Sequence, residues 1–297
     1  MKIRFPKALV AIAAACGLAA APASAQPRDA DPALWVMRDA DTTIYLFGTV
    51  HLLPKDLAWF DEAIADAFNA SDELKLEILP VDNPASLGPL VMKFALDPNG
   101  RNMAQRLSKD DHAAYVKALN EIGLPADQLE PFEPWFVALQ AVALMYAKAG
   151  YDPALGGEQI LTAAARKAGK TITAFETPEQ QFAMLDATPE TEQLIGVRDL
   201  ASRREEGLLV MSKIIEQWAR GDAKETGRLM NEEMKRTPET ARILLTERNV
   251  RWAAALKERL SRPGTVFVAV GAGHLTGKNS VQNLLASKGI KVDRVRY

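Results

Sequence analysis

Residues 265–275 read TVFVAVGAGHL, and this stretch decides the fold class. Its first six residues are apolar and rich in β-branched side chains, and they are long enough only for a buried strand. A helix near 279–287 and a last strand over 291–296 are expected to follow. A strand, a helix and a strand within about 30 residues form a parallel crossover unit. The end of the chain therefore predicts an α/β fold.

The other expected strands are scattered along the chain. Two β-rich runs, 34–38 and 42–47, flank an Asp-Ala-Asp turn and predict a hairpin. Two more strands are expected at 73–78 and 171–176, and helical patterns fill most of the remainder. No Gly/Ser-rich linker separates these segments. We therefore predict a single α/β domain over residues 26–297, with a central mixed sheet of mostly parallel strands and a large helical insertion.

The first 25 residues have the three parts of a secretory signal peptide. Basic residues come first, an apolar run over 8–21 follows, and Ala23-Ser24-Ala25 supplies a small-residue cleavage site. The apolar run is too short for a comfortable membrane span, although an uncleaved anchor is an alternative. Lipidation at Cys16 is a second, minor alternative. We expect a periplasmic or secreted protein with no transmembrane segment once the signal is removed.

Composition and missing motifs exclude several function classes. The chain is 48% hydrophobic and 25% charged, which is typical of an ordinary globular protein. Removing the signal takes Lys and Arg from 36 to 33 against 38 acids, and no basic stripe is left to bind nucleic acid. Cys16 is the single cysteine, so cleavage also removes thiol chemistry and Cys-ligated zinc. Motifs of serine hydrolases, dinucleotide-binding proteins, Walker NTPases and H-E-x-x-H proteases are absent.

Two of the three histidines occupy similar turns. His51 and His274 each end a G-x-x-H motif that directly follows an apolar strand. Glu77 and Glu176 lie at the ends of two other expected strands. Side chains at the carboxyl ends of strands in an open α/β sheet converge, and ligands bind there. Two imidazoles with one or two carboxylates can hold a divalent cation.

Each of these residues also has a structural interpretation. Glu77 could face solvent at a sheet edge. Glu176 precedes Thr177, which could cap the following helix, so the alternative to a metal-site role for Glu176 is a role at the entry to that helix. The third histidine, His112, stands at a helix start and is expected to be solvated.

A charged residue lies on the apolar face of the helix expected over 239–260. Counting from Leu245 at helical spacing places Arg248 and Asn249 on the same stripe as Trp252 and Leu256. A buried guanidinium is costly unless it is paired. Arg248 therefore either forms a structural salt bridge with an acid of the sheet or stabilises negative charge in the strand-end site.

Taken together, these segments resemble the TraB/GumN family, which is related to the Tiki proteases. The resemblance covers nearly the whole mature chain in the right order, and it rests on residues 44–51, 76–77, 174–181, 247–249 and 268–275. It implies a divalent-metal site built from His51, Glu77 and His274, with Arg248 and Asn249 close by. It also implies a fold related to the erythromycin-esterase-like and ChaN-like proteins.

The resemblance carries functional expectations. Tiki members are Mn- or Co-dependent membrane-anchored proteases, and ChaN-like relatives bind haem. Leu79 departs from the family pattern, because Tiki-like sequences usually have an aspartate at that position. We therefore expect fewer protein groups around the metal than in the protease members. We predict an exported hydrolase that uses Mn, Co or Zn on a small-molecule or peptide substrate, with Arg248 stabilising the oxyanion and Glu176 as a general base or supporting group. The alternative is a non-catalytic periplasmic binding protein for haem or a peptide signal.

Overall fold

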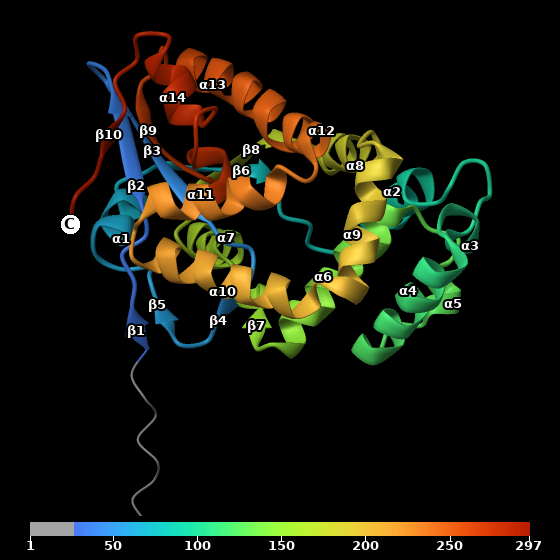
Figure 1. The fold of residues 1–297 in the computed structure, drawn as a ribbon. Helices are drawn as coiled ribbons and strands as arrows, with labels where there is room; N and C mark the ends of the chain where they lie inside the picture. The colour runs from blue at the N-terminus through green and yellow to red at the C-terminus, as the bar shows by residue number, and fades with distance from the viewer. Residues whose placement is uncertain (1–26) are drawn as a thin grey trace, which may run out of the picture.

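The computed structural model describes residues 27–297, and its centre is a six-stranded sheet (Figure 1). The strand order is β10-β2-β3-β9-β6-β8. The four strands β3, β9, β6 and β8 are parallel, whereas β2 and β10 are antiparallel to their neighbours. The predicted mixed, mostly parallel sheet is confirmed. The strand bounds are β2 Leu34–Arg38, β3 Thr42–Thr49, β6 Glu73–Ile78, β8 Thr171–Glu176, β9 Gly264–Gly271 and β10 Asp293–Arg294.

The predicted hairpin and crossover are both present. In the turn between β2 and β3, the Asp39 carboxylate accepts hydrogen bonds from the backbone N–H groups of Asp41 at 3.2 Å and Thr42 at 2.9 Å. After β9 the chain passes through α14 (Val281–Ala286) to β10. Because β10 is antiparallel to β2, and β2 to β3, β10 runs in the direction of β9. It is shorter than predicted and forms the outer edge of the sheet, where β2 and β3 separate it from β9.

Helices cover both faces of the sheet, and alternate side chains of β9 are buried on the two faces. Phe267 and Ala269 face a core shared with α1 (Glu62–Asn69), α7 (Gly157–Lys167) and α10 (Arg204–Ala219). Val266, Val268 and Val270, which alternate with them, face a second core built with α13 (Glu247–Arg259) and α14. Burying one such side chain stabilises the fold by roughly 1.5–3 kcal/mol. This two-sided burial explains the continuous apolar run of β9.

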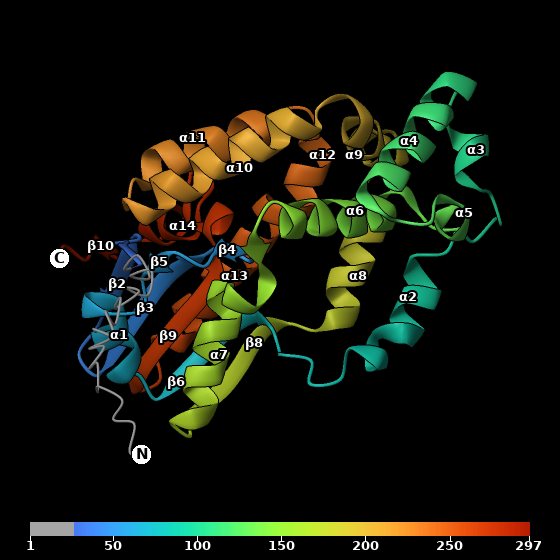
Figure 2. The same cartoon turned by 90° about the horizontal axis from the view of Figure 1, so that it is seen from below.

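The predicted helical insertion lies in two stretches, before and after β8. Helices from both stretches build a third core away from the sheet. Figures 1 and 2 both place α3 (Met103–Arg106), α4 (Lys109–Ile122) and α5 (Ala126–Leu129) at the end of the molecule opposite β2 and β10. The remaining helices are α2 Gly88–Phe94, α6 Pro134–Lys148, α8 Pro178–Asp186, α9 Glu190–Ser202, α11 Ala223–Met234 and α12 Pro238–Ala241.

Short elements complete the chain. Two-residue strands pair as β1 (Arg28–Asp29) with β5 (Leu57–Ala58) and as β4 (Leu53–Pro54) with β7 (Tyr151–Asp152). The short helical turns are η1 Pro84–Leu87, η2 Pro153–Leu155, η3 Arg242–Thr246 and η4 Ala272–Leu275. The turn η3 is a π-helix, so the single helix predicted over 239–260 is wrong in detail. It is a continuous series of α12, a π-turn and α13.

The predicted signal peptide, its cleavage after Ala25 and the alternative at Cys16 fall on residues 1–26, outside the described residues. Within residues 27–297, no helix combines the length and the apolar character that crossing a membrane requires. Export and localisation stay predictions from the sequence.

Candidate metal centre

The three predicted metal ligands surround a small space beside Gly271. The parallel strands β3, β9 and β6 are neighbours, so their carboxyl ends lie at one edge of the sheet. A Cβ atom added at Gly271 would lie 3.2 Å from Glu77 Oε1, 3.7 Å from His51 Nε2 and 3.8 Å from His274 Cδ2. The structure therefore brings His51, Glu77 and His274 together as the sequence predicted. Only the absence of a side chain at Gly271 leaves this space open.

The hydrogen bonds of His274 fix which ring nitrogen carries the proton. The amide nitrogen of Asn249 donates to the carbonyl of Asn279 at 2.8 Å, so the amide oxygen of Asn249 faces His274 Nδ1 at 2.6 Å. Nδ1 must then donate, which leaves a lone pair on Nε2. Burial lowers the pKa of His274 to about 4, so the ring is neutral at pH 7. His274 is thus prepared as an Nε2 ligand, a role in which a second hydrogen bond orients the ring.

Glu77 is held in the centre of the site. Its Oε1 accepts a hydrogen bond from the Gly271 backbone N–H at 2.7 Å, and its Oε2 accepts one from Arg248 at 2.5 Å. Burial raises the pKa of Glu77, but the neighbouring His274, Arg248 and Gly271 N–H together lower it below its ordinary value. Because β6 lies between β9 and β8, the interpretation of Glu77 as a solvent-facing edge residue is wrong.

Arg248 uses all of its N–H groups within the protein. Nε donates to Glu176 at 3.0 Å, and Nη2 donates to Glu77 and Glu176. Nη1 donates to the carbonyl of Leu244 at 3.0 Å and to His274 Nε2 at 3.1 Å. The side chain is only 8% exposed and its guanidinium lies over the ring of Trp252. The predicted place of Arg248 on the buried face is confirmed, and the salt bridge with acids of the sheet is present.

Glu176 serves as the anchor for this arginine. Both carboxylate oxygens accept hydrogen bonds from Arg248, and Oε1 also accepts one from Trp252 Nε1 at 3.1 Å. The next residue, Thr177, caps α8 through a capping box with Gln180. The helix-entry interpretation is therefore correct for Thr177, while Glu176 itself points to the site.

His51 is held by a residue that the sequence analysis missed. Its Nδ1 lies 2.9 Å from Glu158 Oε1, and Glu158 is in the first turn of α7. The charge of Glu158 and its hydrogen bond raise the pKa of His51 to about 9. A signal was available, because Gly156-Gly157-Glu158 opens a helix and places a carboxylate after two residues without side chains.

A pocket of about 360 Å³ opens from the site. Its lining includes His51, Glu77 and Glu158, together with Leu79 and the neighbouring residues 80 and 81. Among the described residues that line the pocket there is no lysine or arginine. The volume is within the range of small-molecule sites.

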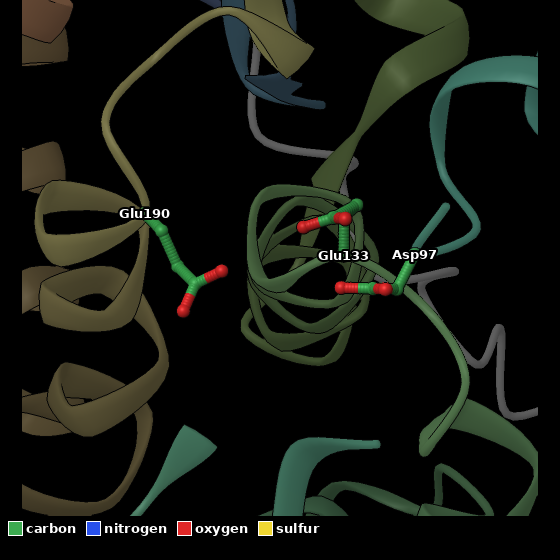
Figure 3. A group of neighbouring side chains, drawn as sticks. All are labelled: Asp97, Glu133 and Glu190. Carbon is green, nitrogen blue, oxygen red and sulfur yellow. The ribbon is translucent and has the colours of Figure 1, made fainter. Parts of the chain in front are cut away.

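Figure 3 shows a second acidic group, in the helical insertion: Asp97, Glu133 and Glu190. Their ligand atoms all lie within 4.8 Å of one another. The ligand atoms of His51, Glu77 and His274 do not all lie this close together. However, Arg106 forms ion pairs with Asp97 and Glu133, and Arg101 forms ion pairs with Asp97 at 2.9 Å and Glu190 at 2.5 Å. The guanidinium groups occupy the positions that a cation would need. We assign this group a structural role.

His112 takes no part in the site. It lies on α4, where its Nε2 is 2.6 Å from Glu130 Oε1. Its side chain is 26% exposed, so it is half-buried and paired, not solvated as predicted.

Comparison with known proteins finds similarity over most of this chain. The model of the TraB/PrgY/gumN family matches residues 33–294. The uncharacterized protein YbaP of Escherichia coli is 22% identical over 254 residues, which cover 86% of this chain and 92% of YbaP. The metalloprotease TIKI2 of Danio rerio is 25% identical, and the match covers 84% of this chain and 58% of TIKI2.

Proposed function

The chain belongs to the TraB/PrgY/gumN family, and from this premise we propose that it is an exported, metal-dependent hydrolase. The observation that supports this most directly is the meeting of two imidazoles and a carboxylate around the space beside Gly271. The similarity to a protein named as a metalloprotease supports the metal dependence. The N-terminal sequence pattern supports export.

The side chains around Gly271 fit a divalent ion. His51, Glu77 and His274 offer two ring nitrogens and one carboxylate oxygen, a set suited to Mn, Co or Zn. His51, whose pKa is raised to about 9, would release its Nε2 proton when the ion binds. Nε2 of His274 carries a lone pair that now accepts a hydrogen bond from Arg248. Binding of an ion at Nε2 would therefore replace that hydrogen bond.

The protein groups have distinct roles in this proposal. A bound divalent ion would polarise a carbonyl group and lower the pKa of a water molecule. Arg248 keeps Glu77 ionised, Glu176 keeps Arg248 in place, and Asn249 keeps the proton of His274 on Nδ1. The oxyanion role of Arg248 stays a prediction, and it requires one N–H to leave its protein acceptor. Both oxygens of Glu176 are occupied, so we favour the anchoring role over general-base catalysis.

The pocket favours a neutral substrate. Away from the predicted metal ligands, the described lining of the pocket offers an acidic group Glu158 and no lysine or arginine to pair with it. Leu79 is 49% exposed and offers an apolar contact beside the reacting carbonyl. We therefore infer that the substrate is an ester or a peptide with an apolar group next to the scissile bond.

Elemental analysis of purified protein tests the metal site. Wild-type protein and His112→Ala should contain one divalent ion per chain, whereas His51→Ala and His274→Ala should each lose it, because each lacks a ligand. Equal metal content in all four proteins would refute the site.

A hydrolysis screen with added Mn or Co tests the reaction. Esters and peptides with apolar residues beside the scissile bond should react faster than matched substrates with aspartate or glutamate there. A Soret band on haem titration, together with no hydrolysis of any substrate, would instead favour the non-catalytic binding protein.

A further inference from the structure

The start of α7 packs unusually closely on the end of β3. The Gly157 N–H donates to the carbonyl of Val50 at 3.0 Å. A Cβ atom at Gly156 would lie 2.2 Å from the carbonyl oxygen of His51, and one at Gly157 would lie 2.9 Å from Thr49 Cγ2. Any larger residue would push the helix away from the strand. The two glycines therefore set the distance between α7 and the turn that carries His51.

This close approach delivers the carboxylate of Glu158 to His51. Glu158 Oε1 lies 2.9 Å from His51 Nδ1, and the Thr49 hydroxyl donates to the same oxygen. The Thr49 contact fixes the carboxylate from the strand side. The Glu158 side chain is 20% exposed, so the carboxylate itself is largely shielded from water.

The Glu158 contact also determines the direction of the opposite ring nitrogen. With Nδ1 directed to Glu158, Nε2 of His51 faces the space beside Gly271. The His51 side chain is 65% exposed, so little packing holds the ring in this orientation. His274, in contrast, is buried and oriented by Asn249. The exposed histidine thus depends on its carboxylate partner more than the buried one does.

We propose that Glu158 is a positioning residue that holds His51 with Nε2 toward Glu77 and His274, and that Gly156-Gly157 place Glu158 for this purpose. The inference rests on the proposed metal site. A carboxylate that orients a ligating histidine in this way typically contributes about 10- to 100-fold to metal affinity. The competing explanation is that Glu158 only stabilises the first turn of α7, as acids do at helix N-termini.

The test compares three variants of the full mature chain. Glu158→Leu removes the acceptor, Glu158→Gln keeps an oxygen that can accept from Nδ1, and Thr49→Val removes only the supporting hydroxyl. Glu225→Leu is the control, because Glu225 is also an acid in the first turn of its helix, α11, and its partner is Arg228 and not a predicted metal ligand. Thermal melts of the metal-free proteins report the helix contribution of each acid.

The first measurement is ¹⁵N NMR of the histidine rings in metal-free protein, which is practical because the chain has three histidines. The hydrogen-bonded Nδ1 proton of His51 should be present in wild type and Glu158→Gln and absent in Glu158→Leu. An unchanged signal in Glu158→Leu would overturn the proposal, whatever the metal affinity.

The second measurement is Co(II) titration, followed by the visible spectrum of the bound ion. Glu158→Leu should bind about 10- to 100-fold more weakly than wild type. Glu158→Gln should recover part of the lost affinity. The affinity of Thr49→Val should fall between those of wild type and Glu158→Leu, and the affinity of Glu225→Leu should match that of wild type. Equal affinity of Glu158→Leu and wild type would overturn this inference and leave the metal site standing. Failure of wild type itself to bind Co(II) would refute the proposed function, while the NMR result would still decide whether Glu158 holds His51.

Discussion

Replacing Arg248 with methionine should destabilise the protein strongly. The side chains of Arg248, Glu176 and Glu77 are 8%, 5% and 12% exposed, so the substitution leaves two carboxylates buried without their cation. Glu176 would keep only the Trp252 N–H and weak contacts, and Glu77 the Gly271 N–H. Breaking a buried pair from one side costs about 3–5 kcal/mol. At ~2–4 °C per kcal/mol for a chain of this size, Tm should fall by roughly 6–20 °C.

Urea unfolding of metal-free protein measures this loss as a free energy. Adding Glu176→Gln to Arg248→Met should recover part of the stability, because one of the two unpaired charges is removed. Arg251→Met is the control on the same helix: its side chain is 53% exposed, and the change should cost at most about 1 kcal/mol. The reasoning is refuted if Arg248→Met costs less than the control, or if Glu176→Gln makes the loss larger.

Three further predictions concern other parts of the chain. Burial raises the pKa of Asp97, but hydrogen bonds from backbone N–H groups and from Arg101 and Arg106 outweigh burial and lower it to about 2. Its stabilisation is therefore complete above about pH 4 and is lost as pH falls toward 2, so Asp97→Asn should show a shallower acid dependence of unfolding free energy than wild type. Gly271→Ala should keep the fold but weaken Co(II) binding at least about tenfold, since the added Cβ enters the space between the ligands; unchanged affinity would contradict this site. Protein recovered from the periplasm should have an intact mass that begins at Gln26, and a lipidated start at Cys16 would contradict that expectation.

Much of the fold was predictable from local patterns. The strand bounds expected at 34–38, 73–78 and 171–176 are those of β2, β6 and β8. The alternation of apolar and polar residues and the turn residues at strand ends are local signals, which can be read within a few positions of the sequence. The buried position of Arg248 was equally predictable, since helical periodicity survived the π-turn that precedes it. The end strand was overestimated because its length depends on its partner β2, not on its own sequence.

The sequence by itself determined which residue types end the parallel strands, and so it indicated His51, Glu77, Glu176 and His274 as candidates for one site. The resemblance to the family, also read from the sequence, implied that three of them, His51, Glu77 and His274, bind the metal. Tertiary structure alone decided how these side chains are held. The Glu77 contact with Arg248 joins residues 171 positions apart, and the Thr49 contact with Glu158 joins residues 109 apart. Such partners are chosen by which helix packs against which strand end, and periodicity carries no information about that choice. An ionisable side chain acquires its orientation, its pKa and its function from those distant neighbours.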